Sequence, residues 1–537
     1  MLSLFKKSEA QTRAIRRKMR ARRRLRTECL EGRRLLAGVV NVDTTAAGDL
    51  SLVGDVSNNS IAVHGTAVPG QFVIEGQSGT LLTLDGGLQT FSTLTVNGIT
   101  DDLIAALGEG QDRFELGNAS DPTDIGNDVT ITNSDDDTNV LTNVDIGGAL
   151  SVTRADTAYS DLSLTGSIVR SGVTIDNNDG DTKTTITSSE IEGLLDIDNG
   201  AGDDVIVVDG TSIGAALFTR PGLPGNPSNP VVDIVNGNGS SLTSFTQKND
   251  PDATGFLPSG TLDRPTIFGG INISNGEPIP AGLVVPPPVV GGSTPSQLAV
   301  AVDIVVFNQA DVLGHVDIDN TDGHTETVIV NSNLGTDTKE YDAGDLPNSG
   351  YGGPVTIDNG IGFDVLEFND STAQYGMSVN NGTGTHGSAT EIRNSEFGGR
   401  GAAGLGLTFM GDDGDTVFNI SDDTTGTMID GLLSITLGDG HDSVQLSGIA
   451  GGSQIMMDSL TIVGDEGDDG VLIQNTEIDS MVMISLADGA DTIEIRDGID
   501  FPSGLLGTID IDGGIGADFF FVSDTTIPLT DFQIPIS

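Results

Sequence analysis

The residues of this chain best suited to chemistry are aspartates in short glycine-rich turns. Each turn closes on Gly-x-Asp and lies between two stretches in which apolar and polar residues alternate. Five closing aspartates near the C-terminus follow one another at 27, 27, 22 and 27 residues. Such carboxylates can bond the turn backbone, or they can serve as hard oxygen ligands for Ca²⁺. The candidate residues are Asp204, Asp364, Asp415, Asp442, Asp469, Asp491, Asp512 and Asp518.

The elements that must position these turns are short strands. Period-two alternation on both sides of each turn predicts two or three strands per unit of 22–27 residues, which is too short for a propeller blade. We therefore expect an all-β fold, a parallel β-helix (β-solenoid) in which neighbouring coils lie about 4.8 Å apart. Tandem β-sandwich domains are the alternative, because such a unit also fits two strands of a hairpin array.

Weaker copies of the pattern extend the expected stack toward the N-terminus. In these copies the closing position is assigned to Thr138, Ser160 and Thr182, and later in the chain to Thr390. Serine and threonine keep a small side-chain oxygen that can bond the local backbone.

Composition divides the chain into four parts. Residues 1–37 form a basic leader, and residues 38–218 and 297–537 form two parts of the solenoid. Residues 219–296 hold 13 of the 20 prolines. Because proline removes ladder donors, we expect this range to be an insertion, either a surface excursion or a binding loop. A second, shorter insertion is expected at residues 335–353.

Charge excludes some partners and favours others. Residues 1–40 carry 13 Lys/Arg against three Glu, whereas the remainder carries 11 Lys/Arg against 75 Asp/Glu. So negative a body disfavours nucleic acid, whose binding depends on neutralising phosphates, and it favours cations. No apolar run reaches the roughly 18–20 residues of a membrane-spanning helix, so no such helix is expected.

The stacked turns raise an electrostatic question. Equivalent carboxylates of successive coils, such as those of Asp442, Asp469, Asp491 and Asp518, are expected to lie one above another along one edge. At about 5 Å apart, two of them would repel by on the order of 3 kcal/mol at an effective dielectric of 20, and by much less in open water. We therefore expect these carboxylates to be exposed. A divalent cation between coils would remove the repulsion altogether.

The leader resembles a known export segment. Leu30, Glu31, Arg33, Leu35 and Leu36 match the Leu-Glu-Pro-Arg-x-Leu-Leu segment of surface and secreted proteins of planctomycete bacteria, with Gly32 in place of the usual proline. This resemblance implies an extracellular or cell-surface location, with cell-envelope or extracellular-matrix components as partners.

The last turn resembles a calcium-binding repeat. Residues 513–521 fit the Gly-Gly-x-Gly-x-Asp-x-apolar-x nonapeptide of RTX proteins in full, and residues 199–204 and 359–364 fit in part. The family repeats its nonapeptides in direct tandem, whereas here 13–18 further residues separate the copies. The resemblance implies calcium binding, and turn capping is the competing interpretation.

Long parallel β-helices also resemble pectate lyases and polygalacturonases. Such lyases need a cationic base beside acidic ligands, but the basic residues of the body are scattered. The five histidines show no metal-binding spacing, and His324 and His441 are expected to be solvated turn residues. We therefore expect a non-catalytic, acidic structural or adhesive repeat protein. A β-helix lyase or hydrolase acting on acidic polysaccharide is the alternative.

Overall fold

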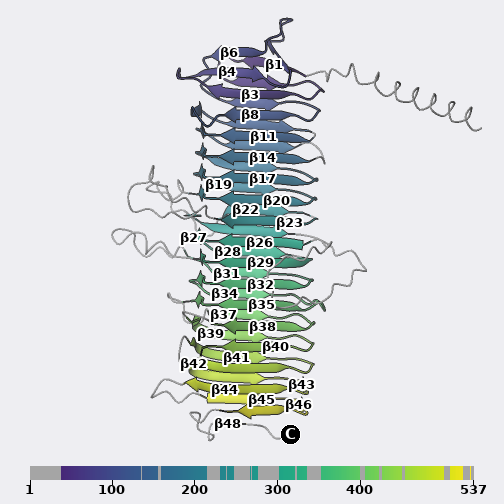
Figure 1. The fold of residues 1–537 in the computed structure, drawn as a ribbon, viewed down its shortest axis with the longest axis vertical. Coiled ribbons are helices and arrows are strands. Elements are labelled where there is room, and N and C mark those ends of the chain that lie inside the picture. Colours follow the sequence, from purple (N-terminus) through teal and green to yellow (C-terminus); the bar gives the residue numbers. More distant parts are fainter. Residues whose placement is uncertain are drawn as a thin grey trace, which may run out of the picture.

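The chain forms a straight rod of stacked β-coils, as the computed structural model shows (Figure 1). The fold is a β-solenoid with a parallel-dominated sheet, so the expectation of a parallel β-helix is confirmed and that of tandem β-sandwiches is wrong. The structure describes residues 38–134, 136–154, 159–214, 230–237, 239–246, 266–267, 269–275, 302–320, 323–335, 352–398, 406–422, 426–449, 454–500, 508–523 and 532–533.

Three columns of strands run along the rod, and in most coils a strand pairs in parallel with the strand three further along the chain. The first column, before the closing turn, comprises β2 (Leu50–Val53), β7 (Leu103–Ala106), β10 (Val129–Asn133), β13 (Leu150–Arg154), β16 (Gly172–Asp176), β19 (Leu194–Asp198), β22 (Pro230–Asn236), β25 (Gly270–Asn275), β28 (Val316–Asn320), β31 (Val355–Asp358), β34 (Met377–Asn380), β37 (Leu407–Met410), β45 (Thr508–Asp512) and β48 (Phe532–Gln533).

The second column, after the turn, comprises β3 (Ser60–Gly65), β8 (Arg113–Gly117), β11 (Asp137–Thr142), β14 (Ser160–Thr165), β17 (Thr182–Thr187), β20 (Asp204–Asp209), β23 (Ser241–Thr246), β26 (Val302–Asn308), β29 (His324–Val330), β32 (Asp364–Asn369), β35 (Ser388–Arg393), β38 (Thr416–Ser421), β40 (Ser443–Ser447), β44 (Thr492–Asp500) and β47 (Phe519–Val522).

The third column consists of very short strands: β9 (Thr123–Ile125), β12 (Val144–Ile146), β15 (Ile168–Val169), β18 (Glu190–Ile191), β21 (Ser212–Ile213), β24 (Thr266–Ile267), β27 (Asp311–Val312), β30 (Asn333–Leu334), β33 (Thr372–Ala373) and β36 (Glu396–Phe397). Toward the C-terminus, longer strands bend through more than one column: β39 (Met428–Thr436), β41 (Ile455–Val463) and β42 (Gly470–Ser485). The short strands β43 (Asp488–Gly489) and β46 (Ile515–Gly516) pair separately in the last turns.

Antiparallel pairing distinguishes the N-terminal end. Here β1 (Val39–Thr44) pairs antiparallel with β2, and β4 (Gln71–Gly76) pairs antiparallel with β3 and with β6 (Thr93–Asn97). A further strand, β5 (Leu81–Leu84), pairs in parallel with β1. An edge strand is prone to pair with other chains, so these strands protect this end of the stack.

Alternation along each strand builds the core. In β20 every second side chain is buried, which places Ile206 and Val208 inside and Val205 and Val207 at the surface. The interior is narrow enough for aromatic rings of successive strands to touch, as in the stacked pair Phe245–Phe307, whose centroids are 5.2 Å apart. The period-two pattern of the sequence therefore acts as expected.

The range 219–296, expected to be an insertion, contributes strands to the stack. Strands β22 to β25 lie within it and pair in parallel with the coils on either side. The expectation that this range lacks central strands is therefore wrong. The prolines did not prevent pairing because most of them lie outside the described strands, while Pro230 stands at the start of β22.

The coil itself is 22 residues long in the regular part. The coil length can be read from buried asparagines at equivalent positions: Asn177, Asn199, Asn236, Asn275, Asn320, Asn359 and Asn381. They are separated by 22 residues at both ends of this series and by 37, 39, 45 and 39 residues between. The extra lengths fall at corners, after Gly214, Thr246, Asn275 and Gly335. Those segments lie largely outside the described residues, as does the basic leader 1–37. Within the described part, no helix is long and apolar enough to cross a membrane.

Candidate functional site: the closing turns of the coils

One column of polar residues runs down the rod at the position that closes each turn. Strand register places these residues directly above one another in successive coils. The closing column comprises Asn59, Asp112, Asp137, Ser160, Thr182, Asp204, Ser241, Asp303, Thr325, Asp364, Ser388, Thr416, Asp442, Asp469, Asp491 and Asp518.

Side chains of the closing column hold the backbone of the neighbouring coil. The backbone N–H of Asp442 donates to Oδ1 of Asp469 at 3.1 Å, and that of Asp469 donates to Oδ1 of Asp491 at 2.9 Å. The same bond joins Thr416 to Asp442 at 2.7 Å and Asp491 to Asp518 at 3.3 Å. Each carboxylate therefore fastens one coil to the next, which is the role expected of turn capping.

A hydroxyl strengthens this bond at Thr182, Ser241 and Thr325, each of which precedes Asp in the column. Thr182 donates both its N–H and its Oγ1–H to Oδ1 of Asp204, at 3.1 and 2.6 Å. Ser241 makes the same pair of bonds to Asp303, at 3.0 and 2.7 Å. At this position Thr or Ser can therefore donate a hydroxyl hydrogen bond to the Asp of the next coil, in addition to being a small polar residue like Asp.

Six of the eight predicted residues lie in the closing column and two do not. Asp204, Asp364, Asp442, Asp469, Asp491 and Asp518 share it. The predicted alignment of residues 442, 469, 491 and 518 along one edge is confirmed. Asp415 lies one residue earlier, because the register pairs Val417 with Ser443 and so places Thr416 opposite Asp442. Asp512 lies at the opposite end of its turn, where Oδ1 accepts the N–H of Gly514.

Two weaker assignments also move by one or two residues. The closing position is held by Asp137 instead of Thr138, and by Ser388 instead of Thr390. Turn lengths vary between coils, so counting from one Gly-x-Asp to the next misses the register that strand pairing sets.

Glycine in the Gly-x-Asp turn is required by the neighbouring coil. A Cβ on Gly467 would lie 1.5 Å from the carbonyl oxygen of Gly440, and one on Gly489 would lie 1.6 Å from that of Gly467. On Gly516 the corresponding distance to the Gly489 oxygen is 1.4 Å. Backbones of successive turns approach too closely for any side chain, so the motif reflects stacking.

Most of the closing carboxyls are buried, and for these the expectation of exposure is wrong; Asp518, near the end of the stack, is only half-buried. Asp364, Asp442, Asp469 and Asp491 are between 1% and 2% exposed. Burial raises the pKa of Asp204 and Asp442 to about 7 and that of Asp469 to about 6. Burial also raises the pKa of Asp491, and that of Asp364 strongly. The signal was present in the sequence: each of these aspartates stands two residues before a buried apolar side chain, as Asp442 does before Val444, so the same period-two alternation turns it inward.

A second column, at the solvent side of the same turns, contains the exposed groups. His441 donates its backbone N–H to Oδ1 of Asp415 at 3.0 Å, and its Nδ1 accepts the N–H of Asp468 at 3.1 Å. His441 is exposed, as expected for a turn residue. His324 is instead 7% exposed, and its Nδ1 accepts the N–H of Phe363 at 2.9 Å.

A buried asparagine ladder occupies the corner across the turn in the middle of the rod. Each side-chain amide donates to the amide oxygen of the next coil at 2.7–2.9 Å. Its members are Asn177, Asn199, Asn236, Asn275, Asn320, Asn359 and Asn381. Sequence reasoning missed this ladder. Its signal was an asparagine that recurs in each of these coils, either as the last residue of the first-column strand or directly after it.

A hydroxyl ladder fastens another corner. The backbone N–H of Ser167 donates to Oγ of Ser189, and that of Ser189 donates to Oγ1 of Thr211. Ser332 and Ser371 continue the pattern further along the chain. Three corners of the coil thus carry inward polar groups that are bonded to the neighbouring coil.

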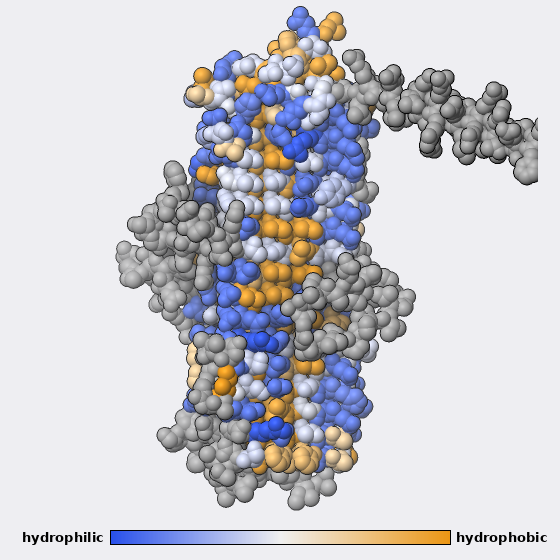
Figure 2. Space-filling view, viewed as in Figure 1, coloured by the Kyte–Doolittle hydropathy of each residue, from blue (hydrophilic) through white to orange (hydrophobic). Residues whose placement is uncertain are grey.

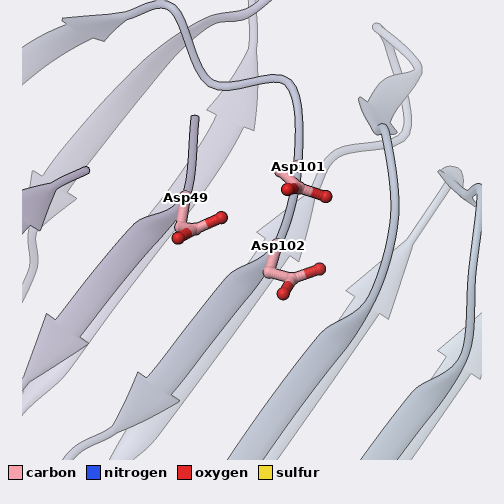
Figure 3. Close-up of side chains that lie close together, drawn as sticks. All are labelled: Asp49, Asp101 and Asp102. Atoms are coloured by element: carbon pink, nitrogen blue, oxygen red, sulfur yellow. The ribbon is translucent and has the colours of Figure 1, made fainter. Parts of the chain in front are cut away.

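An acidic cluster near the N-terminal end was not predicted. Oxygens of Asp49, Asp101 and Asp102 lie within 4.8 Å of one another (Figure 3). Asp102 Oδ1 already accepts the side-chain amide of Asn127 at 2.7 Å. Among described residues, this is the one group of three potential protein ligands brought so close together. The spacing of 52 residues between Asp49 and Asp101 provides no sequence signal.

The closing column by itself does not make a calcium shell. Ca²⁺ takes six to eight oxygens, whereas Asp442, Asp469 and Asp491 each offer one oxygen to a backbone N–H and bury the other. The geometry accordingly supports turn capping at these residues. The exposed carboxylates on the solvent side of the turns, such as Asp415 and Asp468, are the groups that remain accessible to a cation.

The fold and these turns place the chain in the class of acidic β-solenoids with polar corner ladders. No protein-family model matches the chain, and neither a curated protein nor a solved structure does.

Proposed function

We propose that the chain is a non-catalytic, acidic structural or adhesive rod that acts at the cell surface or outside the cell. The observation that carries this proposal is the single stack of parallel coils, whose inward polar groups bond neighbouring coils. Repeat architectures of this kind provide length and stiffness, because each coil contacts only its neighbours. Figure 2 shows outward side chains of like polarity gathered in bands along the rod, which offers an extended surface to a partner.

The location rests on the leader, and it can be tested directly. A full-length chain and a variant lacking residues 1–37 would be expressed in a planctomycete host, and the protein would be followed by surface labelling of intact cells. We expect label on cells or in medium for the full chain and retention inside for the variant. Equal distribution of both would contradict the proposed location.

Adhesion to cell-envelope or extracellular-matrix components is proposed for residues 247–265 and 276–301, which lie between described strands in and next to the range 219–296. Deleting the whole range 219–296 is a poor test, because β22 to β25 would be lost. Strand register indicates cleaner replacements. Residues 247–265 would become Gly-Thr, as at positions 210–211, and residues 276–301 would become Gly-Ala-Gly, as at positions 200–202.

The matched control removes residues 336–352, which restores a 22-residue coil elsewhere on the rod. All variants should keep the circular dichroism spectrum of the parent. We expect the first two replacements to reduce attachment to isolated envelope or matrix preparations and the control to leave it unchanged. Undiminished attachment in every variant would favour a purely structural role.

The alternative is a polysaccharide lyase or hydrolase. Incubating the purified rod with acidic polysaccharides and measuring unsaturated products and reducing ends would reveal such activity. If the rate of product formation rose with protein concentration and disappeared on heating, the enzyme alternative would replace the structural proposal.

A further inference from the structure

Three consecutive closing carboxyls near the C-terminal end are buried with one oxygen unbonded. Asp442, Asp469 and Asp491 each use Oδ1 to accept a backbone N–H of the preceding coil. The other oxygen, Oδ2, is buried in all three and has no hydrogen-bond partner among the described residues. A buried ionised oxygen without a donor is costly, and taking up a proton removes the charge.

The corner that these carboxyls face offers their Oδ2 atoms no side-chain donor. In the middle of the rod this corner carries the asparagine ladder, but that series ends at Asn381. Beyond it, register places Leu437, Gly464 and Leu486 at the same position. A Cβ on Gly464 would lie 2.5 Å from Oδ2 of Asp469 and 3.0 Å from Cδ2 of Leu486. The oxygen therefore faces glycine and leucine, which offer no side-chain donor.

The charged groups around the three carboxyls are almost all acidic. Asp442 faces Asp412 and Asp415 from the coil before it. The coil after it adds Asp469. Further acids and one histidine surround the other two carboxyls: Asp442, Asp491, Asp468 and His441 around Asp469, and Asp469, Asp518 and Asp468 around Asp491. One histidine cannot compensate three ionised carboxyls, so their neighbours favour protonation.

We propose that the C-terminal coils form an acid-stabilised lock, in which Asp442, Asp469 and Asp491 hold protons on Oδ2 while Oδ1 keeps each coil fastened to the one before it. The protons come from solvent as the stack forms. When the pH rises they are lost to solvent, the three carboxylates become charged inside the rod, and the C-terminal coils loosen.

The sign of the effect follows from linkage. Burial raises the pKa of Asp442 to about 7 and that of Asp469 to about 6, above the ordinary value of 3.8, and it raises the pKa of Asp491 as well. Stability from these groups is fully present below their unfolded pKa and is lost as pH rises through the folded pKa. The C-terminal coils should thus lose stability between about pH 4 and pH 7.

The test compares Asp469→Asn with Asp468→Asn. At pH 8 both substitutions remove one negative charge from the same turn, and both residues accept a backbone N–H through Oδ1, that of Asp442 at 3.1 Å and that of Ala490 at 2.8 Å. Asp469 is buried, whereas Asp468 is exposed. General relief of negative charge affects both variants alike, so only the lock distinguishes them.

Melting temperature and hydrogen exchange of full-length protein would be measured at pH 5 and pH 8. For the parent and Asp468→Asn we expect a lower melting temperature at pH 8, with exchange in residues 464–491 several-fold faster than in the Asp469→Asn variant at that pH. Asp469→Asn imitates the protonated carboxyl, so its pH dependence should be smaller. Asp491→Asn serves as a second variant if the first does not fold.

Identical pH profiles for Asp469→Asn and Asp468→Asn would overturn the proposal. A parent whose C-terminal coils exchange no faster at pH 8 than the Asp469→Asn variant would do the same.

Discussion

At the scale of single residues, this rod uses its polar side chains to join coils. Closing carboxylates such as Asp469 accept backbone N–H groups, and asparagines such as Asn236 bond their equivalents above and below. A buried polar group stabilises only when its partners are present, and an unsatisfied one is expensive. The ladders are therefore cooperative along the rod, since each member depends on the next.

Replacing one member of the asparagine ladder should show this dependence. Asn236→Ala removes the acceptor of the Asn199 amide and the donor to Asn275. We expect the free energy of unfolding to fall by about 1–3 kcal/mol for each group left unsatisfied, as measured by urea denaturation.

The control is Asn380→Ala, because Asn380 is more exposed than the ladder asparagines; its side chain donates to Asp358 at 3.1 Å and accepts the N–H of Gly382 at 3.2 Å. We expect a change within about 0.5 kcal/mol for that variant. An equal loss of unfolding free energy in both variants would show that the buried ladder stabilises the rod no more than a surface hydrogen bond does.

At the scale of elements, the unit of the fold is the 22-residue coil. Strand register makes Thr182 and Asp204 equivalent, and the polar corners recur at the same interval. Extra residues are accommodated at corners, where they do not disturb the pairing of β22 to β25 with their neighbours. A coil is thus a module whose removal preserves every column.

Deleting residues 183–204 removes one whole coil and should leave a folded rod. We expect an unchanged β-type circular dichroism spectrum and a rod shorter by about 4.8 Å in small-angle X-ray scattering. Deleting residues 183–193 instead removes half a coil and brings β19 into the place of β17. That variant should unfold or aggregate, and a folded half-coil variant would contradict the modular description.

At the scale of the whole molecule, negative charge is the dominant property. Residues beyond the leader carry 75 Asp/Glu against 11 Lys/Arg, and some outward carboxylates stack directly, as Asp196 does on Asp233. Burial, followed by the charges of Asp233 and Asp198, raises the pKa of Asp196. Repulsion of this kind opposes the folded rod and would be relieved by cations.

Calcium is therefore expected to stabilise the rod. Millimolar CaCl₂ should raise the melting temperature relative to a chelator at equal ionic strength, because a divalent ion neutralises stacked outer carboxylates. Asp469→Asn should keep this response, since its carboxyl is buried. An unchanged melting temperature would show that calcium does not stabilise the rod. Loss of the calcium response in Asp469→Asn would show that calcium binds at the closing turns.

The sequence by itself determined the class of fold and much of the closing column. Alternation of apolar residues and the recurrence of Gly-x-Asp are local properties, and they sufficed to predict a parallel stack with residues 442, 469, 491 and 518 aligned. Tertiary structure decided what spacing could not: that Thr416 closes a turn instead of Asp415, that the carboxyls are buried against the neighbouring coils, and that β22 to β25 belong to the stack. The physical reason is that coil length varies at the corners, so register and burial are set by hydrogen bonding between coils that are distant in sequence.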